Sequence, residues 1–152
     1  MKTWSEIQAE VKRLLKELET VDPHQRLELG SIPKAGVYVF YERRRPLYVG
    51  RSNRLKERIQ EHGRTSSTHN SAPFAFNIAK FRAKKLGVNI EQQRAKLERN
   101  QQFQREFKTA KQRVAKMPVR ILKVRNQVIQ AVFEVYAAIH LKTTKYNDFG
   151  TH

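Results

Sequence analysis

The 152-residue sequence contains no cysteine, no long apolar segment and few acidic side chains. Without cysteine, neither disulfides nor cysteine-ligated zinc sites can form, which fits a reducing compartment. No apolar run approaches the roughly 20 residues that span a bilayer. The first residues, MKTWSEIQAEVKRLLKELE, mix charges throughout and do not resemble a secretion signal. These absences predict a soluble cytoplasmic protein that has no membrane partner.

The shortage of acidic residues makes the chain strongly basic. It has 31 Lys+Arg against 14 Asp+Glu, a formal net charge of +17. A field of this size favours a polyanion, and nucleic acid is the main expectation. A structural RNA-binding protein and, less favoured, an anionic membrane surface are the alternatives. Between Lys80 and Arg125 there are 15 basic and 3 acidic residues, and we interpret this run as a phosphate-binding surface rather than a merely solvated face.

Hydrophobic periodicity and capping residues predict a small mixed domain. The segment 3–19 is expected to be a helix with a Thr3–Glu6 capping box, whose apolar stripe packs onto the domain; a dimer surface is the alternative. Strands are expected at 37–41, 47–50 and 119–124, the first two joined by a turn over 42–46. Further helices are expected at 52–62, 71–86, 126–142 and from Asn89 to Pro118. The predicted class is α+β, with a three-stranded antiparallel sheet flanked by helices.

Several side chains that are suited to phosphate chemistry lie close together in this pattern. The predicted hairpin carries Tyr38 and Tyr48, and the helix that follows carries Arg58 and His62 on the stripe that Leu55 and Ile59 anchor to the core. Far along the chain, Glu134 is surrounded on its helix face by three alanines, at positions 131, 137 and 138. From periodicity alone, a surface glutamate on an alanine-rich helix is the favoured interpretation; a glutamate that looks into a cavity, for which the three alanines leave room, is the alternative.

The triplets GVY and YVG followed by RSNRLKERIQEH closely resemble the GIY-YIG nuclease superfamily. The tyrosines are ten residues apart, Arg58 follows Tyr48 by ten and His62 lies four further on. Glu134, in AVFEVYAAIHLKTTKYN, and Asn147, thirteen residues later, fall where the family has its metal-binding glutamate and its C-terminal asparagine. The resemblance covers 36–62 and 119–147. We expect residues 1–152 to form one nuclease domain, to which hydrophobic periodicity adds an N-terminal helix in 1–22. The stretch 63–117 exceeds the compact core of the family and is expected to be a basic helical insertion.

The resemblance also implies roles for these residues. Glu134 would hold one Mg²⁺ or Mn²⁺ ion, which acts as a Lewis acid on the phosphate. Arg58 would stabilise the charge of the transition state. Tyr38 would take the proton from the attacking water, Tyr48 would orient the water or the phosphate by a hydrogen bond, and His62 would relay the proton from Tyr38. A free phenol has a pKa of about 10 and is by itself a poor base at neutral pH. A covalent phosphotyrosine route is less favoured. Asn147 would either fix the tail or contact phosphate.

Basic residues outside this set are expected to grip the phosphate backbone without reading bases. They lie in and after the hairpin and in the predicted insertion: Arg43, Arg44, Arg45, Arg51, Lys80, Lys84, Lys85, Arg94 and Lys96. The prediction is therefore a divalent-metal-dependent endonuclease that acts on DNA with structural or weak sequence specificity. A non-catalytic DNA- or RNA-binding protein on the same fold is the alternative. A restriction or mobile-element nuclease would differ in its setting. Both a monomer and a homodimer are compatible with the sequence.

Overall fold

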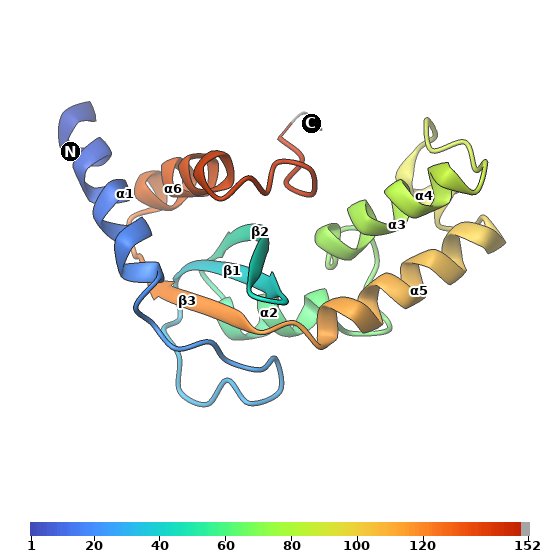
Figure 1. The fold of residues 1–152 in the computed structure, drawn as a ribbon, viewed down its shortest axis with the longest axis horizontal. Helices are drawn as coiled ribbons and strands as arrows, with labels where there is room; N and C mark the ends of the chain where they lie inside the picture. The colour runs from blue at the N-terminus through green and yellow to red at the C-terminus, as the bar shows by residue number, and fades with distance from the viewer. Residues whose placement is uncertain (150–152) are drawn as a thin grey trace. The chain divides into compact units, whose positions relative to one another are not determined.

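The computed structural model describes residues 1–149, which form six helices and three strands (Figure 1). The helices are α1 (Trp4–Leu18), α2 (Leu55–His62), α3 (Pro73–Lys85), α4 (Arg94–Leu97), α5 (Gln101–Ala115) and α6 (Gln127–His140). The strands are β1 (Gly36–Glu42), β2 (Arg45–Ser52) and β3 (Val119–Lys123). The strands form one antiparallel sheet in the order β2-β1-β3, which confirms the predicted α+β class. No helix of this described part is long and apolar enough to cross a membrane.

The chain divides into two compact units. The sheet unit comprises Met1–Glu57 and the described part of Pro118–His152, and the helical unit comprises Arg58–Met117. The boundary falls within α2, so the helical unit starts a few residues before the stretch 63–117 that was expected to be a basic insertion. That the whole chain acts as a single domain stays a prediction.

The sheet unit is built on the alternation of side chains in β1. Val37 and Val39 face one side, where they are fully buried with β2 and β3 residues against α1 and α6. Figure 1 shows both helices on the same side of the sheet. The opposite face carries Tyr38 and Phe40, as the alternation in the sequence predicts. In the strand register Tyr38 lies opposite Gly50 and Phe40 opposite Tyr48, so these two β2 residues share that face.

Side-chain caps fix where the two helices of the sheet unit begin. Thr3 and Glu6 form the expected reciprocal capping box on α1. The Asn126 side chain accepts hydrogen bonds from the backbone N–H groups of Val128 and Ile129, and so begins α6. Trp4 departs from the expectation that it packs in the apolar stripe: as the first residue of α1 it is 61% exposed.

The helical unit has an aromatic core between α3 and α5, which lie side by side in Figure 1. The rings of Phe76, Phe103 and Phe107 form a triangle with centroids 5.0 to 6.0 Å apart. The expectation of one helix from Asn89 to Pro118 is wrong. A short α4 comes first, and α5 begins only at Gln101, because the Asn100 side chain accepts the N–H of Phe103 and caps a new helix there.

Candidate active site

The two tyrosines of the motif lie on the same face of the β1–β2 hairpin. The side chain of Tyr38 is buried and that of Tyr48 is nearly so. Gly50, which lies opposite Tyr38 in the register, leaves the space that the phenol occupies: a Cβ at Gly50 would overlap both the ring and the hydroxyl of Tyr38. The glycine of the second triplet is therefore required by the position of the tyrosine of the first.

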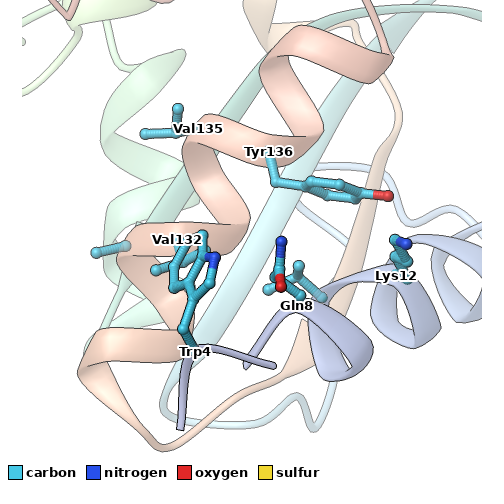
Figure 2. A pocket seen from close by; sticks show the side chains of 8 residues that line it. Trp4, Gln8, Lys12, Val132, Val135 and Tyr136 are labelled. Carbon is cyan, nitrogen blue, oxygen red and sulfur yellow. The ribbon is translucent and has the colours of Figure 1, made fainter. Parts of the chain in front are cut away.

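Glu134 contacts β2 from the helix that covers the other side of the sheet. Its carboxylate Oε1 lies 3.7 Å from Nε of Arg51, and 24% of the glutamate side chain is exposed. The neighbouring alanines have packing roles, since Ala137 and Ala138 are buried in the core and Ala131 lines a groove between α1 and α6 (Figure 2). The alanine spacing therefore reflects helix packing, and the contact with Arg51 is what relates Glu134 to the hairpin.

Asn147 holds the C-terminal tail against the outer edge of β2. Its Oδ1 accepts a hydrogen bond from the backbone N–H of Val49 at 2.9 Å, and its Nδ2 donates to the Val49 carbonyl at 2.7 Å. The Thr143 hydroxyl donates to the same Oδ1 at 2.8 Å. The amide is buried and imitates a neighbouring strand. Of the two roles expected for Asn147, fixing the tail is the one that these contacts match.

Four consecutive residues of β2 each either belong to the candidate residues of the sheet unit or contact one of them. Tyr48 is one of them, Val49 is bonded to Asn147, Gly50 makes room for Tyr38, and Arg51 lies beside Glu134. These contacts come from three distant parts of the chain, namely β1, α6 and the tail. Within the sheet unit, β2 is the element that positions all four candidates.

Arg58 and His62 belong to the helical unit and share the stripe of α2 with the buried Ile59. Nη1 of Arg58 donates to the carboxylate of Glu61 at 3.3 Å and to the carbonyls of Asn70 and Ser71 at 3.1 and 3.2 Å. The guanidinium therefore ties α2 to the loop before α3. His62 is completely buried, and burial together with the charge of Arg58 holds its pKa well below the usual 6.5. The imidazole is therefore neutral at neutral pH.

Lys111, which the sequence presents as one more member of a basic run, has a distinct place in the structure. Its buried ammonium donates to the carbonyls of Thr65 and Ser67 at 2.7 and 2.9 Å and lies 4.2 Å from the centre of the Phe107 ring. Burial lowers the pKa of this lysine. Lys111 therefore fixes the loop that follows His62. In the sequence, the one sign of its burial is its position next to Ala110 and four residues after Phe107, on the apolar edge of the helix.

Most of the expected phosphate-binding residues are solvent-exposed. Arg43, Arg44 and Arg45 project from the hairpin tip, and the first two adopt positive φ angles of 52° and 65°. These are the two central positions of a tight turn, where asparagine and glycine are strongly preferred because side chains strain the backbone. In the helical unit, Lys84, Lys85 and Lys96 are exposed, Lys80 is partly buried, and the Arg94 guanidinium lies 5.9 Å from the centre of the Phe76 ring.

A hard cation such as Mg²⁺ takes carboxylate and phosphate oxygens and keeps several of its waters. Glu134 fits this chemistry, since it offers a partly exposed carboxylate beside the strand that carries Tyr48. The guanidinium of Arg51 would compete with the ion for that carboxylate. Among residues 1–149, no group of three or more His, Cys, Asp or Glu side chains is arranged to hold a metal ion.

A model of the GIY-YIG catalytic domain matches residues 34–114, more than half of the 152 residues. The chain therefore belongs to the GIY-YIG nuclease family, whose substrates are nucleic acids. The match includes Tyr38, Tyr48, Arg58 and His62, covers most of the stretch 63–117, and ends before Glu134 and Asn147. No curated protein and no solved structure matches the chain significantly.

Proposed function

We propose that the protein is a divalent-metal-dependent endonuclease that hydrolyses phosphodiester bonds in DNA. The observation that supports this best is the clustering on β2, where four successive residues carry or contact Tyr38, Tyr48, Glu134 and Asn147. A protein that only binds nucleic acid has no need of a carboxylate beside the strand that carries Tyr48, on a chain of net charge +17. The family match supplies Arg58 and His62 as further members of the site.

In this mechanism the chain provides proton transfer and charge stabilisation. Tyr38, in its phenolate form, removes the proton of the attacking water, and Tyr48 orients the water or the phosphate by a hydrogen bond. As the water oxygen bonds to phosphorus, the bond from phosphorus to one ester oxygen breaks, and that leaving oxygen takes a proton from solvent. The relay expected of His62 would require its buried imidazole to hold the proton only transiently, because burial and the charge of Arg58 disfavour the protonated form. Arg58 stabilises the negative charge that grows on the phosphate oxygens. Glu134 would hold the divalent ion, which when bound would supply Lewis acidity at the scissile phosphate. Positioned proton transfer typically accelerates such reactions by about 10² to 10⁴-fold.

The basic side chains give affinity without sequence specificity. Arg43, Arg44 and Arg45 at the hairpin tip and the exposed lysines of the helical unit contact phosphates, which position a duplex but carry no sequence information. We therefore expect a branched, nicked or otherwise distorted DNA as substrate, or weakly specific cutting of ordinary duplex.

Replacement of Glu134 tests this proposal. Glu134→Gln keeps the shape of the side chain and removes the charge that would hold the ion. We expect Mg²⁺-dependent cleavage of supercoiled plasmid to fall by at least about 10³-fold, equivalent to about 4 kcal/mol, while affinity for DNA stays close to that of the wild type. Glu57→Gln is the control, since its exposed carboxylate pairs with Arg54 on the surface of the molecule. Equal cutting by Glu134→Gln would remove this glutamate from the mechanism.

The second candidate is a non-catalytic nucleic-acid-binding protein, which the net charge of +17 favours. Plasmid, single strands, a branched junction and RNA, each with and without Mg²⁺ or Mn²⁺, distinguish the two functions. Binding without cleavage of any of these substrates would establish the binding protein. Cleavage of RNA but not DNA would keep the hydrolytic mechanism and change the substrate.

A further inference from the structure

An apolar groove lies between α1 and α6 of the sheet unit, on the surface of these helices that faces away from the sheet core. Its volume is about 440 Å³, and it is lined by Trp4, Gln8, Val11, Lys12, Ala131, Val132, Val135 and Tyr136. Figure 2 shows the indole of Trp4 and the ring of Tyr136 among the side chains that line this groove. None of the candidate catalytic residues lines it.

Large apolar side chains at the rim of the groove are exposed to solvent, although such side chains are usually covered by another element. Trp4 is 61% exposed and Ile139 is 61% exposed, and both Val128 and Val135 are also exposed. Val128, Val132, Val135 and Ile139 follow one another along α6 with spacings of four, three and four residues. This is the spacing of helices that pack against another helix. The face that we call the α1–α6 face, comprising the groove and these rim residues, is therefore suited to helix packing that the single chain does not supply.

The α1–α6 face also carries little charge, since Lys12 is the one charged residue among those that line the groove. The helix α1 has three acidic and three basic residues, and α6 has one glutamate and no lysine or arginine. On a protein of net charge +17, these two helices offer phosphates little attraction. For the same reason they form the surface through which two copies of so basic a chain can approach with the least repulsion.

We propose that the α1–α6 face is the interface of a homodimer. A two-fold interface uses the same patch on both subunits, so the patch must be complementary to itself. The α1–α6 face meets this requirement because it carries both a projecting indole, Trp4, and an apolar groove of a size to receive one. Aromatic residues at the centre and few charges are typical of the buried core of such interfaces. This inference does not depend on nuclease activity.

The test uses the full chain after nuclease treatment and a high-salt wash, which remove bound nucleic acid. Sedimentation equilibrium across the micromolar range is expected to show a species of twice 17.9 kDa. Trp4 is the single tryptophan, so its emission reports directly on the interface and is expected to shift to the blue as the dimer forms. Added salt is expected to tighten the dimer, because it screens the repulsion between the copies. Association bridged by nucleic acid would instead weaken with salt.

Two variants locate the interface. Val135→Glu places a charge on the α1–α6 face and is expected to raise the dimer dissociation constant by at least about tenfold. Leu27→Glu is the matched control, since Leu27 is exposed in a loop and does not line the groove; its dimerisation is expected to match that of the wild type. A single 17.9 kDa species with constant tryptophan emission at all concentrations would overturn the proposal. So would a Val135→Glu variant that dimerises as tightly as the wild type, whatever the result of the cleavage assay.

Discussion

The two units of this protein fill their cores in different ways. The sheet unit buries aliphatic side chains such as Val37, Val39 and Val49 between the sheet and two helices. The helical unit packs phenylalanines between α3 and α5 and buries the ammonium of Lys111 among them. In the sheet unit the candidate side chains project from a strand that packs on the aliphatic core. In the helical unit they project from helix surfaces and from the loops that these helices hold.

The units differ in charge as well. Residues 58–117 contain 14 Lys+Arg and 4 Asp+Glu in 60 positions, whereas the remaining 92 positions contain 17 and 10. The sheet unit carries the motif tyrosines, Glu134 and Asn147, and the helical unit carries the denser positive charge. Under the proposed function this difference corresponds to a division of labour, in which the candidate site residues gather on β2 and the helical unit supplies most of the phosphate affinity.

The largest expected effect tests this division directly. Replacing Lys84, Lys85, Arg94 and Lys96 with glutamine is expected to weaken binding to all DNA sequences alike, by about 100-fold at low salt, or about 3 kcal/mol. The slope of log affinity against log salt should become shallower by about 0.9 for each phosphate that the variant no longer neutralises. Fluorescence anisotropy over a salt series measures both quantities.

The matched control removes the same number of positive charges from the sheet unit, at Lys2, Lys12, Arg13 and Lys16 of the α1 region. If both quadruple variants lose equal affinity, net charge alone governs binding and the two units do not differ in this respect. A loss confined to one DNA sequence would mean that the helical unit reads bases.

A second prediction concerns the hairpin tip, where we expect two arginines to contribute to DNA binding at a cost in folding stability. Changing Arg43 and Arg44 to Asn-Gly relieves the positive φ angles of 52° and 65°. We expect this variant to be more stable by about 1 to 2 kcal/mol in urea unfolding and to bind DNA several-fold more weakly. Gains in both stability and affinity would show that these two arginines do not contact phosphate.

A third prediction is a pH dependence of stability that belongs to the helical unit. The folded pKa of His62 lies well below 6.5 because the imidazole is buried beside Arg58. Above pH 6.5 the ring is neutral in both states and its contribution is constant. Below it, the unfolded state binds a proton that the folded state refuses, so stability falls as the pH decreases, by up to about 1.4 kcal/mol per pH unit.

Urea unfolding between pH 7.5 and 5 measures this slope. His62→Gln is expected to flatten it, although burial of the amide also lowers the stability at neutral pH. His140→Gln is the control, because His140 is exposed at the end of α6. An unchanged slope in His62→Gln would assign the acid sensitivity to other groups.

Local patterns in the sequence predicted much of this fold and less of the site. The caps at Thr3 and Asn126 and the two faces of β1 follow from rules that act over a few residues, and the structure confirms them. The same rules misplaced α5, because Asn89 and Asn100 are equally good caps and only packing selects the second. Trp4 fits the apolar stripe of α1 yet is exposed, since periodicity does not say how far a neighbouring element extends.

The candidate site depends on contacts between segments that are distant in the sequence, and the periodicity of one segment does not predict such contacts. Gly50 leaves the space that the Tyr38 phenol occupies, a contact between two strands that the pattern of either strand alone does not reveal. Arg51, which was expected to contact nucleic acid, lies beside Glu134, a residue more than eighty positions away. The roles assigned to Arg58 and His62 stay predictions; the structure adds that one braces a loop and the other is neutral.

The amide of Asn147 has a further consequence for how the sheet ends. β2 is an outer strand, and at Val49 its backbone donor and acceptor are both taken by this one side chain. An outer strand with open backbone groups is a template on which another polypeptide can continue the sheet. The tail therefore occupies the backbone groups of the outer strand at the residue between Tyr48 and Gly50, so that another strand cannot pair there.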